Sequence, residues 1–338
     1  MALINDKEKM IKIASHFAGK RIAVVGDIVL DLYTEGFVER TNPEMPGAPI
    51  LRVVNEKYVL GCAGNVAANL ASLGAEVYLY GILHEDSIKQ KILQICQENK
   101  IKLRYISCEG KNIVKQRLLE KSHNHYIVRA DHGEDNLKPL DEITQKALID
   151  LLDSNGGYDC VVFSDYNKRI FRGSDFGKKL VAFSNEKGIP SVVDAKPANV
   201  MHFKGVTLIR PNEKEARKMY NLENAPIEEV IVKLREMTGS KYAVITRGSA
   251  GVSSLDEIYH EIPTKVREVV DVSGAGDTFL ATLTLSMLSG ASLTEACEIA
   301  NYASGVVVEK AGTATLSIGE LNERIKSEFL RCLCFLTS

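Results

Sequence analysis

The sequence lacks the marks of a secreted or membrane-inserted protein. Its seven cysteines are odd in number and include no Cys-x-x-Cys pair, which favours reduced thiols over a disulfide framework. The N-terminus has neither the apolar segment nor the small-residue cleavage site of a secretory signal. The longest apolar stretch, residues 279–288, is about half as long as a membrane span. We therefore expect a cytoplasmic protein with no membrane partner.

The sequence also has no large excess of positive or negative charge. Lysine plus arginine number 42 and aspartate plus glutamate 44, which gives a formal net charge of −2. Such a chain has no global field for coating nucleic acid, so any anion must be held by a local site. Hydrophobic residues make up 45% of the sequence, and no linker or repeat interrupts it. We expect a single α/β domain over residues 1–338.

Short apolar runs alternate with amphipathic helical patterns along most of the chain. The runs are rich in β-branched residues and predict buried parallel strands at 21–26, 77–82, 160–164, 191–194, 206–209 and 242–246. Helical spacing occurs at 65–73, 86–98, 140–152, 175–187 and 227–237. This alternation predicts a doubly wound, mostly parallel sheet with helices on both faces.

Two stretches, about 33–60 and 102–131, break this alternation. The first is interrupted by prolines and a glycine, and the second contains three short strand patterns with no helix between them. We expect them to form a small antiparallel β flap that covers the carboxyl ends of the parallel strands and excludes water. The alternative is a surface hairpin without a function.

The most distinctive segment is DVSGAGDTF at 271–279, a glycine-flexible loop that leads into a long helix from Thr278. Glycines let successive backbone N–H groups converge, and a helix N-terminus adds unsatisfied N–H groups and a partial positive charge. The segment therefore predicts an anion hole suited to phosphate. Asp277 is either a helix cap or the base that receives the proton of an alcohol.

Other candidate site residues lie near the ends of predicted strands. Asn212 and Glu215 either supply oxygens to a hydrated Mg²⁺ or cap a helix. Lys168 and Lys196 either reach a phosphate or are surface lysines. A tight turn that can approach a nucleotide contains Thr246, Gly248 and Gly251. Binding a polyol requires several hydrogen-bond donors and acceptors. In the first part of the chain, the candidates for this are Asp27, Asp31, Gly61 and Asn65.

The order of these motifs resembles that of the ribokinase-like, PfkB-type carbohydrate kinases over essentially the whole chain. GNVAANLASLGA at 64–75 is similar to the first signature of the family and DVSGAGDTF to the second, with N-x-x-E at 212–215 between them. SDYNK at 164–168 and NYASGVVVEKAGTAT at 301–315 most resemble kinases of D-glycero-D-manno-heptose 7-phosphate. Those enzymes phosphorylate the anomeric hydroxyl of that sugar in ADP-heptose biosynthesis.

The resemblance implies a ribokinase-like fold and an ATP-dependent sugar kinase. It makes Asp277 the catalytic base, and it lets the backbone of Gly274, Ala275 and Gly276 stabilise the transferring phosphoryl group. It also assigns Mg²⁺, through water, to Asn212 and Glu215. The ATP site would be lined by Thr246, Gly248, Gly251 and Asn301, and the sugar would be held by Asp27, Asp31, Gly61 and Asn65. A monovalent cation such as K⁺ would lie by Asp271, Ser273 and the loop Gly312–Thr313.

A phosphorylated acceptor needs cations beyond those that bind ATP. The second flap stretch offers Lys115, Arg117 and Arg129 at alternating spacing, and arginine binds phosphate as a bidentate fork. The alternative is basic residues on a solvated strand face. We expect a small sugar phosphate as partner, and a homodimer through the flap because an exposed sheet face or edge needs covering.

Some features depart from the family pattern and keep alternatives open. Cys62 stands where the family usually has glycine, and a side chain there can narrow the sugar pocket. The sequence has no His-x-Gly-His motif of a fused nucleotidyltransferase, so we expect a monofunctional kinase. The other hypotheses are a kinase of an unphosphorylated sugar or nucleoside, and an inactive kinase-fold scaffold or sensor. An oxidoreductase is disfavoured because no G-x-G-x-x-G follows the first strand.

Overall fold

The main body is built around one large sheet. The computed structural model describes residues 2–45, 47–122, 125–135, 137–266 and 268–336. Nine strands follow the order β13-β12-β11-β10-β9-β8-β1-β4-β5. Neighbours from β11 to β5 along this order are parallel, and the pairs β11–β12 and β12–β13 are antiparallel. The strands are β1 Arg21–Gly26, β4 Glu76–His84, β5 Lys102–Cys108, β8 Cys160–Ser164, β9 Ser191–Asp194, β10 Leu208–Ile209, β11 Tyr242–Thr246, β12 Val252–Leu255 and β13 Tyr259–Ile262.

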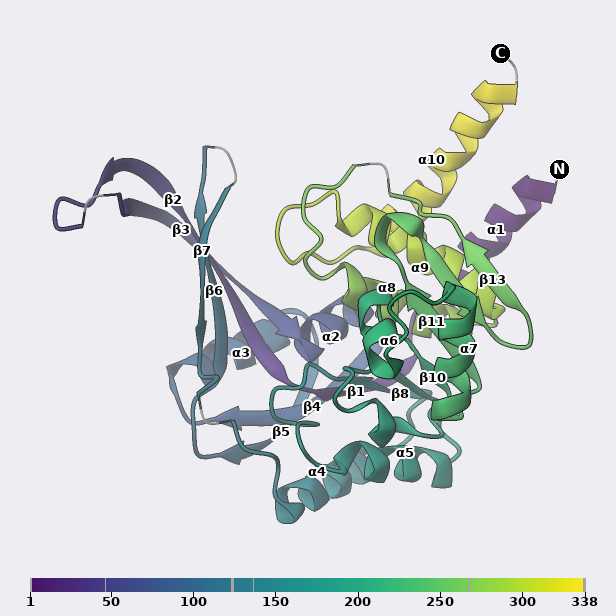
Figure 1. The fold of residues 1–338 in the computed structure, drawn as a ribbon, viewed down its shortest axis with the longest axis horizontal. Helices are drawn as coiled ribbons and strands as arrows, with labels where there is room; N and C mark the ends of the chain where they lie inside the picture. Colours follow the sequence, from purple (N-terminus) through teal and green to yellow (C-terminus); the bar gives the residue numbers. More distant parts are fainter. Residues whose placement is uncertain (1, 46, 123–124, 136, 267, 337–338) are drawn as a thin grey trace.

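Helices cover both faces of this sheet, which explains why its central strands are apolar at nearly every position. In β1, Ile22 and Val24 join one hydrophobic cluster, whereas Ala23 and Val25 join another on the opposite face. The first face carries α1 Ala2–Ala14, α2 Ala63–Ser72, α3 Ser87–Glu98, α8 Ala275–Leu288, α9 Leu293–Val307 and α10 Ile318–Leu336. The second carries α4 Glu142–Asn155, α5 Phe176–Glu186, α6 Glu213–Tyr220 and α7 Ile227–Thr238. Figure 1 shows α4 and α5 on the side of the sheet away from α2 and α8, which confirms the predicted doubly wound arrangement.

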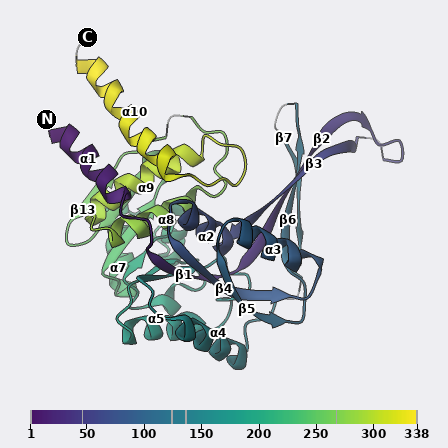
Figure 2. The same ribbon diagram turned by 180° about the vertical axis from the view of Figure 1, so that it is seen from behind.

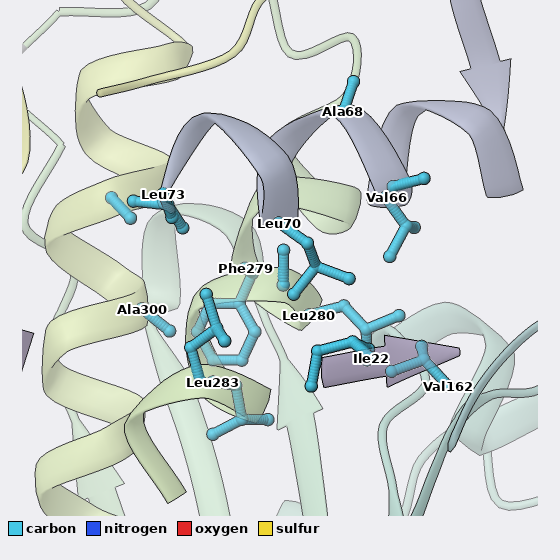
Figure 3. Packing of buried hydrophobic residues seen from close by; sticks show 14 of the residues in the cluster. Ile22, Val66, Ala68, Leu70, Leu73, Val162, Phe279, Leu280, Leu283 and Ala300 are labelled. Carbon is cyan, nitrogen blue, oxygen red and sulfur yellow. The ribbon is translucent and has the colours of Figure 1, made fainter. Parts of the chain in front are cut away.

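Helix α8 is enclosed by its neighbours. All its residues from Asp277 to Ser286 are buried. In Figure 3, Leu280 and Phe279 lie among side chains of α2, α9 and β1, including Leu70, Ala300 and Ile22. Because close packing on all sides leaves little freedom, the N-terminus of α8 is held in a fixed position over the sheet. The helix begins at Ala275, three residues before the predicted start, so part of the glycine loop forms its first turn.

A second sheet of four strands stands beside the body and forms the predicted flap (Figures 1 and 2). Its order is β3-β2-β6-β7. The hairpins β2–β3 and β6–β7 are antiparallel, and β2 pairs with β6 in parallel. The outer ends of β2 and β3 extend well beyond the body (Figure 2). The four strands are β2 Ile28–Thr41, β3 Pro49–Cys62, β6 Ile113–Glu120 and β7 His125–His132.

The boundaries of the flap differ from the prediction. Residues 102–108 are predicted to belong to the flap, but β5 pairs in parallel with β4 at the edge of the main sheet, with Lys102 opposite Tyr78. Strand β2 begins at Ile28, earlier than the predicted 33. A short apolar strand has the same pattern in either sheet, so periodicity cannot assign it to one of them.

Among the described residues, no helix combines the length and apolar composition that a membrane crossing requires.

Candidate active site

The candidate site lies where the parallel strands β8 to β11 end, beside the N-terminus of α8. Open α/β sheets bind ligands at this edge because the loops after the strands converge there. A cavity of about 390 Å³ opens at this place. Its lining comes from the loops after four strands and from α8, and includes Tyr166, Asp194, Lys196, Arg210, Asn212, Thr246, Gly274, Gly276 and Asp277.

The glycine loop enters α8 in a conformation that needs glycine at two positions. Gly274 has a φ of +80°, and a Cβ there would lie 2.7 Å from Nδ2 of Asn65. A Cβ on Gly276 would lie 2.6 Å from the guanidinium of Arg210. The N–H of Ala275 donates to Val272 O at 3.3 Å, whereas those of Gly274 and Gly276 have no partner within the described residues. These amides and the start of α8 make the cavity a site suited to an anion.

Asp277, in the first turn of α8, is buried with 5% of its surface exposed. Asn65 Nδ2 donates to its Oδ2 at 2.7 Å, and the Tyr166 hydroxyl donates to its Oδ1 at 2.7 Å. Burial raises the pKa of Asp277 to about 6, although both donors act in the opposite direction. Within the described residues the carboxylate bonds to these two side chains and not to the helix backbone, so it does not act as a helix cap there, and its role as the base stays a prediction.

Arg210 links the anion site to the sheet. One guanidinium nitrogen pairs with Asp194 Oδ2 at 2.8 Å, and another donates to Gly276 O at 2.5 Å. Both side chains are almost fully buried. Breaking such a pair costs about 3–5 kcal/mol because it leaves an uncompensated charge in the interior. A fixed positive charge therefore stands next to the first turn of α8.

Asn212 and Glu215 form a capping box at the start of α6. The Asn212 side chain accepts the N–H of Glu215 at 2.9 Å, and Glu215 accepts the N–H of Asn212 at 3.2 Å. The Glu215 carboxylate also pairs with Lys196 Nζ at 2.5 Å. The direct contacts of Asn212 and Glu215 are therefore those of a helix cap. Asn212 and Lys196 also line the cavity. Lys168, in contrast, pairs with Glu134 at 2.5 Å.

A second cavity, of about 430 Å³, adjoins the first and shares Thr246 and Gly276 with it. All four residues predicted to line an ATP site line this cavity, since Gly248, Gly251 and Asn301 join Thr246 there. The rest of its wall is mainly apolar, from Val252, Val266, Val269, Val272, Phe279 and Val308. An apolar slot that opens beside an anion site suits a nucleotide base with its phosphates directed toward α8.

The flap brings Asp31 to the other side of the site. Asp31 accepts from Arg117 at 2.8 Å and from the Thr313 hydroxyl at 3.2 Å. Gly61 lies directly against it, since a Cβ there would be 2.8 Å from Asp31 Oδ2. The N–H of Thr313 donates to the Tyr33 hydroxyl at 2.8 Å. These bonds fasten the flap to the loop after α9 and leave carboxylate and hydroxyl groups beside Asn65 and Asp277.

Asp27, a predicted sugar contact, bonds to the backbone of the loop after β8. Its carboxylate accepts the backbone N–H groups of Lys168, Arg169 and Ile170 at 3.1, 3.0 and 2.9 Å. Burial raises its pKa despite these bonds. The side chain therefore holds the loop after β8 in place. Asp27 and Asp31 are only four residues apart at the start of β2, so the sequence could not show which of them faces the site.

The three predicted phosphate ligands of the flap lie in different surroundings. Lys115 Nζ is 3.6 Å from Cys62 Sγ and lies over the ring of Tyr166, 5.5 Å from its centroid. Arg117 is bound to Asp31, as described above. Arg129, which is opposite Arg117 in the β6–β7 pair, bonds to Asp131 at 2.8 Å and is more than half exposed. Lys115 therefore contacts the ring of Tyr166, whose hydroxyl bonds to Asp277.

Asp271, a predicted ligand of a monovalent cation, organises two loops. It accepts the N–H of Ser273 at 2.8 Å and that of Gly312 at 3.0 Å. The hydroxyl of Tyr126, on flap strand β7, donates to it at 2.7 Å. These donors keep the pKa of Asp271 below its ordinary value although burial acts to raise it. The carboxylate thus joins the flap, the glycine loop and the loop after α9.

Four residues of this site are not identified by the sequence patterns alone. Tyr166 enters only through the family resemblance, Arg210 and Asp194 belong to no predicted motif, and the sequence leaves Lys196 between a phosphate contact and a surface lysine. All of them lie at or directly after the end of a predicted parallel strand. Collecting every polar residue at those ends is the signal that would have found them.

The comparisons with known proteins agree with this arrangement. Residues 20–318 match the pfkB family carbohydrate kinases. The bifunctional protein HldE of Mesorhizobium japonicum is 35% identical over 320 residues, which are 93% of this chain and 64% of that protein. The bifunctional protein HldE of Campylobacter jejuni subsp. jejuni is 34% identical over 314 residues, 91% of this chain and 65% of that protein. The chain thus spans just under two thirds of the length of these relatives.

Solved structures share the fold at low identity. Phosphofructokinase-2 from Escherichia coli in complex with potassium superposes with a TM-score of 0.77 at 17% identity. Ribokinase of Arabidopsis thaliana complexed with ribose and ATP gives a TM-score of 0.69, also at 17% identity. Each comparison covers 91% of this chain and 99% of the other. The ribokinase-like fold is therefore confirmed, and the family match over most of the sequence shows that the chain belongs to the pfkB family of carbohydrate kinases.

Proposed function

We propose that this chain transfers the γ-phosphoryl group of ATP to the anomeric hydroxyl of D-glycero-D-manno-heptose 7-phosphate. The observation that carries the phosphoryl transfer is the buried carboxylate of Asp277 between the anion site of α8, the nucleotide-sized cavity and the flap. The phosphorylated acceptor is supported by the HldE relatives and by Lys115 and Arg117, which the flap holds on the acceptor side.

In the proposed reaction the anomeric oxygen attacks the γ-phosphorus while the bond from that phosphorus to the β,γ-bridging oxygen breaks. The sugar proton passes to Asp277, and ADP leaves. The backbone around Gly274 and Gly276, together with Arg210 and Lys196, stabilises the negative charge of the phosphoryl group. Phosphoryl transfer depends mainly on positioning and electrostatics, so a carboxylate with a pKa of about 6 is a sufficient base at neutral pH.

The residues around the cavity fit a hydrated Mg²⁺. Asp194 Oδ1 is a buried carboxylate oxygen without a partner in the described part of the chain, so it can accept from a water of the ion. We assign the ion, through water, to Asn212 and Glu215, and it would neutralise charge on the ATP phosphates. A K⁺ ion beside Asp271 and Ser273 is proposed because the Escherichia coli phosphofructokinase-2 structure contains potassium.

A second candidate function is a kinase of an unphosphorylated sugar. The observation in its favour is that Arg117 and Arg129 each pair with a carboxylate, which offsets part of the positive charge that an acceptor phosphate would meet. An inactive scaffold or sensor has less support, since it gives no reason for a buried carboxylate held by two donors beside an anion site.

Product analysis tests the proposed function. The protein is incubated with Mg-ATP and a mixture of the heptose 7-phosphate, fructose 6-phosphate, ribose and fructose, and the products are identified by mass spectrometry. We expect a bisphosphate of the heptose alone. A product from ribose or fructose would support the second candidate, and the absence of any phosphorylated product would favour the inactive scaffold.

The substitution Lys115→Met tests the acceptor phosphate. A lysine that binds phosphate contributes a charge-assisted hydrogen bond, so we expect KM for the heptose phosphate to rise by about 10- to 100-fold. KM for ATP should stay near its wild-type value. Lys146→Met on α4 is the matched control because Lys146 is 79% exposed and pairs only with Asp150 among the described residues. Equal KM values in both variants would remove Lys115 from the acceptor site.

We also propose a homodimer in which two flaps pack together. The flap exposes apolar side chains that a lone soluble domain would be expected to cover: Val38, Val53, Val54, Tyr126 and Val128 are 38–51% exposed. Its outer strands β3 and β7 also present unpaired edges. An Escherichia coli phosphofructokinase-2 structure is described as tetrameric, so oligomers occur among proteins of this fold.

Sedimentation velocity tests the dimer. We expect twice the monomer mass for the wild type and the monomer mass for Val53→Asp, because a charge in an apolar interface is costly to bury. Ile143→Asp on α4 is the control, since Ile143 is 83% exposed and lies outside the flap. A monomeric wild type at micromolar concentration would contradict the proposal.

Replacement of the base, Asp277→Asn, tests the proposed mechanism. We expect kcat to fall by about 10²- to 10⁴-fold, the usual contribution of a positioned acid or base. ATP should bind with nearly unchanged affinity, because the nucleotide cavity does not include Asp277. Steady-state kinetic assays measure kcat, and titration with a fluorescent nucleotide measures the affinity for ATP. Turnover near the wild-type rate would show that Asp277 is not the base.

A further inference from the structure

Tyr166 occupies an unusual place for a tyrosine. It is the second residue after β8, is held between the body and the flap, and donates its hydroxyl to Oδ1 of Asp277 at 2.7 Å. Two ammonium groups lie over its ring: that of Lys115 from the flap at 5.5 Å from the centroid, and that of Lys196 from the body at 5.2 Å. Each such cation–π contact contributes about 0.5–2 kcal/mol, so the ring is held from both parts of the molecule.

The backbone of Tyr166 is fixed as firmly as its ring. Its neighbour Asp165 is fully buried and accepts the N–H of Asn167 at 2.7 Å and that of Lys196 at 2.8 Å. The Asn199 side chain donates to the same carboxylate at 3.1 Å. Asn167 adopts a φ of +51°, which turns the chain sharply after the tyrosine. The position of the Tyr166 hydroxyl is therefore set before any substrate arrives.

We propose that Tyr166 is the positioning residue of the base: its hydroxyl fixes the orientation of the Asp277 carboxylate and keeps that carboxylate ionised at neutral pH. This inference rests on the proposed function of Asp277. Asn65 holds the other oxygen, so the two donors together set the plane of the carboxylate. Each carboxylate oxygen keeps a second lone pair, and one of these can accept a hydrogen bond from the hydroxyl of the acceptor.

The groups that face Asp277 come from several elements. Asp194, at the end of β9, raises the pKa of Asp277, whereas Arg210, after β10, lowers it. Cys62, before α2, is neutral because burial raises its pKa far above the ordinary value. Lys115 and Lys196 lie across the Tyr166 ring. Among the described side chains, only those of Asn65 and Tyr166 are hydrogen-bonded to the carboxylate.

The direction of the effect follows from these contacts. Burial raises the pKa of Tyr166 well above its usual range, so its hydroxyl remains a proton donor throughout the working pH range. A donor stabilises the ionised carboxylate over the protonated form. Removing the hydroxyl must therefore raise the pKa of Asp277. The base would then be protonated at higher pH, and activity would be lost there.

The test compares the pH dependence of kcat for the wild type and Tyr166→Phe at saturating ATP and acceptor. A hydrogen bond to a charged group corresponds to a shift of about 1–2 pH units. We expect the acidic limb of the variant to move upward by that amount, so that kcat falls about 2- to 10-fold at pH 7 and recovers above pH 9. Tyr158→Phe is the matched control, because that buried hydroxyl bonds to Tyr80 and not to the site.

Two outcomes would overturn the inference. If the acidic limbs of Tyr166→Phe and the wild type coincide, the hydroxyl does not act on the base. If kcat of the variant is low by the same factor at every pH, Tyr166 acts in some way other than holding the base ionised. Recovery at high pH distinguishes the proposed role from a general loss of structure, which would not be reversed by pH.

A second measurement does not depend on turnover, so it separates this inference from the proposed function. The infrared band of the protonated Asp277 carboxyl group is assigned by its absence in Asp277→Asn and followed against pH. We expect its midpoint to be higher in Tyr166→Phe than in the wild type and unchanged in Tyr158→Phe. If the titration midpoint of Asp277 rises in Tyr166→Phe but the protein phosphorylates no sugar, the role of the Tyr166 hydroxyl is supported and the proposed kinase function is rejected. If the midpoint is unchanged in an active kinase, only the role of the Tyr166 hydroxyl is rejected.

Discussion

The structure depends on keeping one carboxylate buried, correctly oriented and still able to ionise. Burial raises the pKa of Asp277 to about 6, and its two hydrogen-bond donors act against this rise by favouring the ionised carboxylate. Its two donors come from α2 and from the loop after β8, which are 212 and 111 residues away along the chain. The packing of α2 against α8, visible in Figure 3, is therefore also a requirement of the site, because it brings Asn65 within reach of Asp277.

The same region contains two ion pairs close to each other. Arg210 and Asp194 pair in the interior, and Lys196 pairs with Glu215 beside them. These cations are held in place before a nucleotide binds, so no reorganisation is needed when charge develops on a transferring phosphoryl group. On the opposite side, Asp271 and Asp31 connect the flap to loops of the body through Tyr126 and Thr313. The flap is thereby fastened to the loops beside the site instead of standing as a separate hairpin.

Much of the fold was open to prediction because its signals are local. Both faces of the main sheet are covered, so strands such as β8 are continuous apolar runs, and helices such as α3 begin at a capping aspartate, Asp86. The grouping of Thr246, Gly248 and Gly251 around one cavity also followed from local sequence, since they share one turn. The edge strand β5 was assigned to the wrong sheet because its pattern contains no information about its neighbour.

The sequence by itself determined the fold class, the glycine-rich start of α8 and the presence of an acid next to it, since each depends on residues adjacent along the chain. The tertiary structure alone decided which side chains meet that acid. It placed Tyr166 and Asn65 on Asp277, turned Asp27 away to the backbone of 168–170, and brought Arg210 against Gly276. The physical reason is that a side chain after a strand can point in several directions, and only the packing of segments distant in sequence selects one.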